Sequence, residues 1–153
     1  MNRTRLTPHF CLEELLFSQQ AVRHGIGNTP PGSALINLSR LAEVLERIRA
    51  AVGNRTVTVT SGYRSPALNQ RIGGSRASAH MDGRAADIVV RSMTPLQVAR
   101  AIQGAGIALD QLIFEGSWVH VGIAKVGEPS RGDVLTAHFG PDGVKYQRGI
   151  VAA

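Results

Sequence analysis

The apolar residues of segment 33–52 recur three and four positions apart, and charged residues fall mostly on the other faces. This spacing predicts a long amphipathic helix that buries one stripe, and Gly53 suits its carboxyl end. A shorter helix is predicted at about 11–24, ended by Gly25, with a turn-rich link over 27–32. The predicted stripe consists of Leu38, Leu41, Leu45, Ile48 and Val52.

From residue 56 the pattern becomes that of strands. The segment Thr56–Thr60 alternates with period two and is rich in β-branched residues. Ser65–Pro66 and Thr94–Pro95 each place a capping residue before a proline, which predicts two short helices ending near Gly73 and Gly104. The order of the elements, with helices first and strands later, predicts an α+β domain. In this domain a small, mainly antiparallel sheet packs against the N-terminal helices. Further strands are expected at 85–91, 109–115 and 118–123, with 134–139 as an additional candidate and 74–84 as a loop.

The length of 153 residues fits a single domain that buries a core without disulfides, and Cys11 has no second cysteine to pair with. We divide the chain into an N-terminal helix and link (1–32), a central core (33–123) and a C-terminal extension (124–153). No apolar run reaches the roughly 20 residues needed to span a bilayer. The basic N-terminus lacks the apolar core of a secretory signal, so we expect neither membrane insertion nor a signal peptide.

The formal net charge is +6, and Lys125 and Lys145 are the only lysines, so arginine supplies most of the positive charge. Such a balance favours a polyanionic partner, which could be nucleic acid, an acidic membrane or an anionic cell wall. The basic residues are scattered, without interleaved aromatic residues, and this disfavours nucleic acid.

Three polar residues in apolar surroundings, His80, Asp87 and His120, raise the question of a metal site. If Gly116–Ser117 forms a two-residue type II′ turn, the predicted hairpin pairs Ile113 with His120 and Glu115 with Trp118. Glu115, Trp118 and His120 then share one face of the sheet, which suits a metal-ligand histidine with a carboxylate beside it.

His80 and Asp87 are seven residues apart and meet only if the chain folds back, for which Asp82–Gly83 offers a turn. A carboxylate that begins an apolar strand is costly to bury unless it is paired or binds a metal. Two histidines and one carboxylate, with a fourth position open, form the pattern of catalytic zinc. The alternative is that Asp87 pairs locally with Arg84 or Arg91 and that both histidines are ordinary.

The segments Ser61–Pro66 (SGYRSP), Ser78–His80 (SAH) and Trp118–His120 (WVH), with Gly83 and Asp87 between them, resemble the zinc D-alanyl-D-alanine carboxypeptidase family. That family includes phage peptidoglycan endopeptidases. The segment Phe10–Pro31 and the long helix resemble its phage and prophage members, so the resemblance extends to about residue 123.

The resemblance implies Zn²⁺ held by His80, Asp87 and His120. It also implies that Arg64 binds the substrate carbonyl or carboxylate and steadies the developing oxyanion, and that Ser78 hydrogen-bonds the substrate backbone. Trp118, on the same face, is a further substrate-binding candidate.

The chain departs from the family's pattern at the general base. Many family members carry Asp or Glu three residues before the last histidine, where this chain has Ser117. Glu115 is the best substitute, and the predicted hairpin puts it on the correct face. Asp82 and Asp110 are weaker candidates. Without a base, the protein would bind peptidoglycan without cutting it.

The sequence therefore predicts a zinc metallopeptidase that hydrolyses peptide bonds in peptidoglycan, as a stem-peptide carboxypeptidase or a cross-link endopeptidase. We expect a phage or prophage endolysin, made in the host cytoplasm and acting at the cell wall after release, or a virion component with virion proteins as partners. The alternative is an inactive structural or wall-binding phage module on the same fold. The bond that is cut, the oligomeric state and the role of residues 124–153 stay open.

Overall fold

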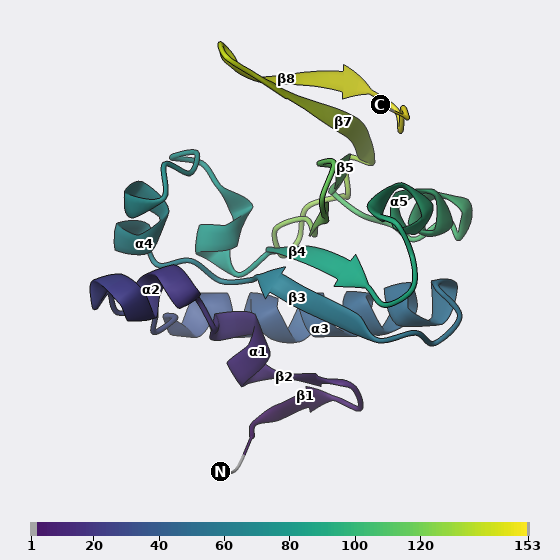
Figure 1. Cartoon of the computed structure of the whole chain (residues 1–153). Helices are drawn as coiled ribbons and strands as arrows, with labels where there is room; N and C mark the ends of the chain where they lie inside the picture. The colour runs from purple at the N-terminus through teal and green to yellow at the C-terminus, as the bar shows by residue number, and fades with distance from the viewer. Residues whose placement is uncertain (1–2, 153) are drawn as a thin grey trace.

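A six-stranded sheet, ordered β3-β4-β6-β5-β7-β8, organises the computed structural model, which describes residues 3–152 (Figure 1). Neighbouring strands are antiparallel except for the parallel pair β5 and β7. The predicted α+β class with a mainly antiparallel sheet in a single domain is thus confirmed. The strands are β3 (Val57–Ser61), β4 (Ala85–Val90), β5 (Gln111–Phe114), β6 (Val119–Gly122), β7 (Asp133–Gly140) and β8 (Gly143–Arg148).

The long helix α3 (Gly32–Ala51) lies against one face of this sheet, and α5 (Pro95–Gly104) packs beside it (Figure 1). The predicted stripe of α3 is buried, and it meets the strand residues that alternate toward the helices, such as Ile88, Val119 and Val121. The residues between them, including Asp87 and His120, therefore point to the opposite face. The sheet separates an apolar core from the surface that carries the candidate chemistry.

The N-terminal segment differs from the single helix predicted at 11–24. It forms α1 (Leu12–Leu16) and α2 (Gln19–His24), preceded by a small hairpin of β1 (Arg5–Thr7) and β2 (Phe10–Cys11). Phe17 is extended, and the Ser18 side chain accepts a hydrogen bond from the Ala21 amide as the N-cap of α2. A serine in this position starts a new helix instead of continuing the old one. The predicted end at Gly25 is confirmed, since this residue has φ 63°.

The other predicted elements lie within two residues of their observed bounds. Ser65 and Thr94 cap α4 (Pro66–Arg71) and α5 as predicted. The expected loop 74–84 contains a short 3₁₀ helix, η1 (Ala79–Asp82). The tail forms two paired strands, β7 and β8, which extend away from the body of the protein (Figure 1). The division at residues 32 and 123 stays a prediction.

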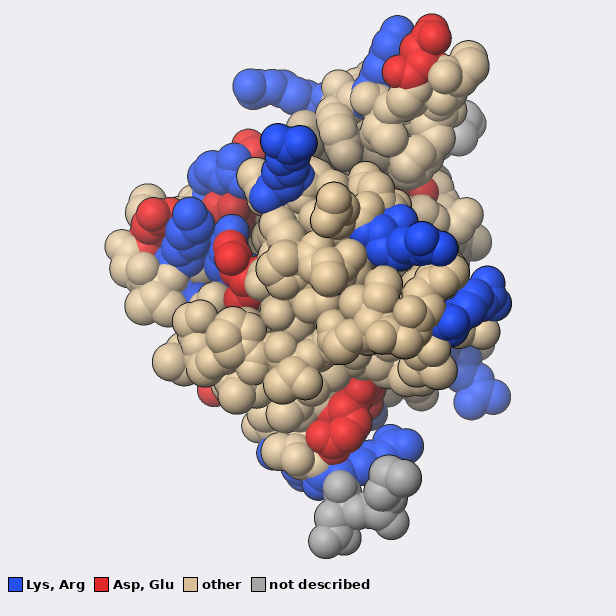
Figure 2. All heavy atoms as spheres, turned by 90° about the vertical axis from the view of Figure 1, so that its left-hand side faces the viewer, with Lys and Arg blue, Asp and Glu red and all other residues tan. Residues whose placement is uncertain are grey.

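Positive charge is spread over the surface, as the sequence indicated. On the face in Figure 2, lysine and arginine side chains are separated by uncharged surface, and acidic side chains lie among some of them. Between residues 3 and 152, no helix combines the length and apolar character required to cross a membrane.

Candidate active site

The sheet brings Asp87 and His120 together. In the antiparallel pair of β4 and β6, Asp87 lies directly opposite His120. Residues opposite each other point to the same face, and His120 Nδ1 lies 3.1 Å from Asp87 Oδ1. The two side chains come from strands 33 residues apart in the chain, so their meeting is a product of strand register.

His80 reaches the same place from η1. The Ser78 side chain caps this turn by accepting a hydrogen bond from the His80 amide, and Gly83 ends the turn with φ 73°. The predicted reversal at Asp82–Gly83 is therefore present. The His80 ring is almost fully buried, and its Nδ1 lies 2.8 Å from the Gly62 carbonyl oxygen. Nδ1–H donates to that oxygen, which leaves Nε2 free as an acceptor or metal ligand.

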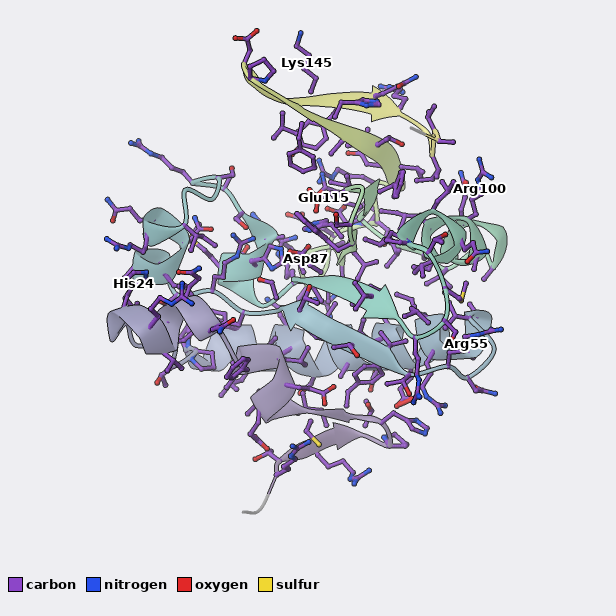
Figure 3. All side chains as sticks on the ribbon, viewed as in Figure 1. His24, Arg55, Asp87, Arg100, Glu115 and Lys145 are labelled. Carbon is purple, nitrogen blue, oxygen red and sulfur yellow. The ribbon has the colours of Figure 1, made fainter. Side chains whose placement is uncertain are left out.

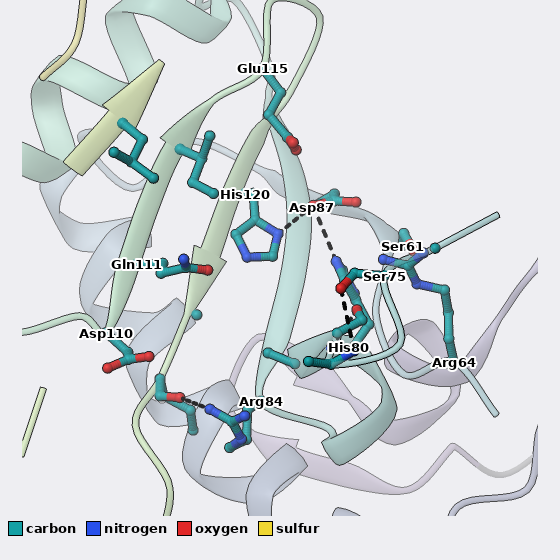
Figure 4. Close-up of a pocket in the computed structure, with 18 of the residues that line it drawn as sticks. Ser61, Arg64, Ser75, His80, Arg84, Asp87, Asp110, Gln111, Glu115 and His120 are labelled. Atoms are coloured by element: carbon teal, nitrogen blue, oxygen red, sulfur yellow. Dashed lines mark hydrogen bonds and ion pairs between the residues drawn. The ribbon is translucent and has the colours of Figure 1, made fainter. Parts of the chain in front are cut away.

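The three side chains present one donor atom each within 4.8 Å of one another. His80 Nε2 lies 3.5 Å from Asp87 Oδ1, close to the 3.1 Å between His120 Nδ1 and the same oxygen. A tetrahedral zinc site with bonds of about 2.0–2.2 Å has donor atoms about 3.3–3.6 Å apart. Two nitrogens and one carboxylate oxygen at these separations fit a divalent metal (Figure 4).

Asp87 is ionised in this environment. Burial alone would raise the pKa of Asp87, but its hydrogen bond with His120 and the close approach of His80 hold the pKa far below its ordinary range. Burial also lowers the pKa of His80, against the opposing effect of Asp87. Metal binding requires an ionised carboxylate and neutral histidines. The directions of these two pKa shifts favour those forms of Asp87 and His80.

Glu115 lies on the same face, as the hairpin prediction required. Ile113 pairs with His120, the Glu115 amide donates to the Trp118 carbonyl, and Gly116 has φ 80°, so the predicted register is confirmed. The Glu115 carboxylate points toward Asp87 (Figures 3 and 4) and accepts a 2.5 Å hydrogen bond from Trp118 Nε1. Burial raises the pKa of Glu115, and the negative charge of Asp87 raises it further. The neighbouring His120, Trp118 and Arg64 act in the opposite direction and lower this pKa, but their effect is smaller. A carboxylate with a raised pKa is suited to accept and return a proton near neutral pH.

Arg64 faces the same region from the segment after β3. The Arg64 amide donates a hydrogen bond to the His80 carbonyl oxygen, so the backbone of Arg64 is bonded directly to a residue of the candidate metal site. Burial lowers the pKa of Arg64, whereas the negative charges of Asp87 and Glu115 raise it. Its Nε is buried without a hydrogen-bond partner in the structure. A buried donor with no partner is costly.

These residues line a groove of about 1240 Å³ on the exposed face of the sheet. Besides Arg64, the other two predicted substrate contacts, Ser78 and Trp118, also line it, although the Ser78 hydroxyl already caps η1 and the Trp118 indole N–H donates to Glu115. The groove continues past Gln111 toward Asp110 and Arg131.

Arg84, one of the two arginines proposed as a partner of Asp87, is engaged elsewhere. Arg84 binds Asp82 at 2.9 Å and the Ile123 carbonyl oxygen at 3.0 Å, and so does not pair with Asp87. Asp110 is bound by Arg131 at 2.9 Å, and this hydrogen bond lowers the pKa of Asp110. The two weaker base candidates, Asp82 and Asp110, are thus tied to arginines, whereas Glu115 is not.

Two functional features escaped the sequence prediction. The Gly62 carbonyl oxygen orients His80, but a backbone acceptor leaves no mark in the sequence. The β7–β8 hairpin lines the groove, and it did leave a signal, because Val144 and Tyr146 alternate with polar residues after the turn pair Asp142–Gly143.

Comparison with known proteins agrees with this geometry. Residues 8–122 match the family described as Peptidase M15. The chain belongs to this family. It is also 33% identical over 78 residues to the zinc D-Ala-D-Ala carboxypeptidase of Streptomyces albus G, an alignment that covers 51% of this chain and 29% of that protein. The chain thus spans less than a third of its relative's length. The predicted resemblance to the zinc D-alanyl-D-alanine carboxypeptidase family is confirmed. The relative's name and the donor set both agree with the predicted Zn²⁺ cofactor.

Proposed function

We propose that this Peptidase M15 chain is a zinc-dependent peptidase that hydrolyses peptide bonds in bacterial peptidoglycan. The observation that carries the proposal is the convergence of His80, Asp87 and His120 beside Glu115 in one open groove. The name of the Streptomyces albus G relative supports both the metal and the class of bond.

In this proposal the side chains of His80, Asp87 and His120 would hold the ion. Bound zinc supplies Lewis acidity, which polarises a carbonyl group and lowers the pKa of water. Glu115 accepts a proton from the attacking water and later delivers it to the leaving nitrogen as the C–N bond breaks. Arg64 donates hydrogen bonds to the substrate oxygen on which negative charge develops. Trp118 holds the Glu115 carboxylate toward the reacting atoms.

The first test is metal content per chain, measured by mass spectrometry on protein purified without chelators, for the wild type and His80→Ala. We expect about one zinc in the wild type and its loss in the variant, because three protein ligands define such a site. A wild type that takes up no zinc even when it is offered would overturn the proposal.

The second test is digestion of purified peptidoglycan, with products analysed by mass spectrometry. Loss of a terminal D-alanine from the stem would mean carboxypeptidase action, and separation of linked stems would mean endopeptidase action. Glu115→Gln keeps the shape and the acceptor for Trp118, and we expect it to retain zinc but lose about 10²- to 10⁴-fold in kcat. A zinc-loaded wild type that cuts no wall fraction would instead support the wall-binding module.

We also propose a phage or prophage role for the protein, as an endolysin or a virion component. Support comes from the resemblance of Phe10–Pro31 and the long helix to phage members of the family. The net charge of +6 favours approach to an anionic wall. Detection of the chain in purified virions by mass spectrometry would separate a virion component from a released lysin.

A further inference from the structure

One wall of the groove comes from a part of the chain beyond the family match. The match ends at residue 122, whereas the hairpin of β7 and β8 covers 133–148. Four apolar residues of this hairpin line the groove, namely Leu135, Phe139, Val144 and Tyr146.

Strand register carries the catalytic face continuously onto this hairpin. Asp87 pairs with His120, His120 with Ile113, and Ile113 with Leu135, so one row of residues crosses four strands. Farther along the hairpin, Phe139 pairs with Val144. Because paired residues share a face, the apolar side of the hairpin and the metal candidate open onto the same groove.

From Val144 to Gln147 and on the facing residues of β7, the two sides of the hairpin differ in polarity, and Arg148, opposite Leu135, is the charged residue of the groove side. The outer side carries His138, Lys145 and Gln147, and His138 Nε2 lies 2.9 Å from Gln147 Oε1. On the groove side, Phe139 and Tyr146 are each 56% exposed. An amphipathic hairpin normally turns its apolar side to the core, so an apolar side left open to a groove indicates a ligand surface.

Trp118 joins this surface to the catalytic residues. Its ring centroid lies 6.1 Å from that of Phe139, at an interplanar angle of 49°, while its indole N–H binds Glu115. Partial burial raises the pKa of Tyr146, and the charge of Glu115 adds to this, which reflects their proximity. We call Trp118, Phe139, Val144 and Tyr146 the aromatic wall.

We propose that the aromatic wall binds a sugar ring of the glycan strand that carries the peptide substrate. This inference rests on the proposed function and adds a subsite to it. Open aromatic faces suit a ligand that is itself amphipathic, and a sugar ring has an apolar C–H face bordered by hydroxyl groups that stay in water.

Charge and distance favour the same occupant. None of the four wall residues is charged at neutral pH, so these four offer no partner to a stem-peptide carboxylate. Arg148 pairs with Leu135 and so shares their side of the hairpin, but it does not line the groove, whereas Arg64 does. β8 lies three strands from β6, which is about 14 Å at roughly 4.8 Å per strand. The β8 end of the wall, formed by Val144 and Tyr146, therefore reaches a part of the substrate several bonds away from the scissile peptide.

The test is a titration of the wild type with the peptide-free repeating disaccharide of the glycan, which a peptidase cannot cut. Trp118 is the sole tryptophan, so its fluorescence reports binding at the wall. We expect a saturable change. Phe139→Ala and Tyr146→Ala should each weaken binding about three- to tenfold, and Tyr146→Phe should retain it. Lys145→Ala, on the outer side of the same hairpin, is the matched control and should bind as the wild type does.

Turnover gives the second readout. With a disaccharide-peptide, Tyr146→Ala should lose the same factor in kcat/KM as it loses in binding, whereas its turnover of the sugar-free peptide should be unchanged. An absent fluorescence response, or an equal loss on both substrates, would overturn the sugar subsite. If no substrate is cut, the peptidase proposal fails, and the titration still decides whether the wall binds sugar.

Discussion

Replacing Gly62 by alanine should damage both the fold and the metal site, because this residue lies where β3 meets α1. A Cβ on Gly62 would lie 2.3 Å from the Leu15 carbonyl oxygen and 2.9 Å from the Leu15 carbonyl carbon. An ordinary contact begins at 3.4 Å, so the two backbones must separate by about 1.1 Å (3.4 − 2.3). Leu15 is fully buried and its carbonyl oxygen accepts the Tyr63 amide at 2.8 Å, so neither side moves freely.

The expected cost follows from these contacts. Overpacking of a tight site costs about 1–3 kcal/mol, and loss of the Tyr63–Leu15 hydrogen bond adds about 1 kcal/mol. We therefore expect Gly62→Ala to lower the free energy of unfolding by about 2–4 kcal/mol. The same displacement of the Gly62 backbone stretches the 2.8 Å hydrogen bond between its carbonyl oxygen and His80 Nδ1, which orients the His80 ring. Loss of a hydrogen bond that orients a metal ligand typically lowers metal affinity about 10- to 100-fold.

Urea unfolding with a chelator present measures the first effect, and zinc competition against a chromophoric chelator measures the second. Gly104→Ala is the matched control, because a Cβ there meets nothing within 4 Å at the end of α5. That control should be neutral or slightly stabilising. Wild-type stability in Gly62→Ala would refute the packing argument. Reduced stability with unchanged zinc affinity would refute the claim that Gly62 orients His80.

Two further changes probe groups on either side of the metal candidate. Arg64→Lys keeps the charge but loses the planar fork, so we expect kcat to fall about 10- to 100-fold with zinc content unchanged; an unaltered kcat would argue against oxyanion stabilisation by Arg64. Arg131→Ala should destabilise the fold by at most about 1 kcal/mol at pH 7, since Arg131 is largely exposed. The Arg131 hydrogen bond lowers the pKa of Asp110, so its contribution is present above the ordinary carboxyl pKa near 4 and is lost as pH falls through the lowered value. Urea unfolding at pH 7 and in acid should show the difference between wild type and variant shrinking in acid, whereas a constant difference would contradict the assignment.

Local patterns predicted the helices and most strands because each depends on neighbours in the chain. The stripe of α3, the caps at Ser65 and Thr94 and the Gly116–Ser117 turn were all readable in this way. The break at Ser18 was missed because the apolar residues on both sides favour a continuous helix, and only the hydrogen bond of the cap ends it. Strand β8 was missed although Val144 and Tyr146 alternate with polar residues, because its alternating segment is short and the strand is exposed along its whole length.

The sequence by itself determined the residue types of the candidate site and, through the hairpin turn, the common face of Glu115, Trp118 and His120. Only the tertiary structure decided that His80 and Asp87 join them. That meeting depends on the pairing of β4 with β6 and on a carbonyl oxygen of Gly62, two contacts between segments far apart in the chain. Periodicity reports which face a residue occupies, but strand order and backbone acceptors are fixed only when the whole sheet packs on α3.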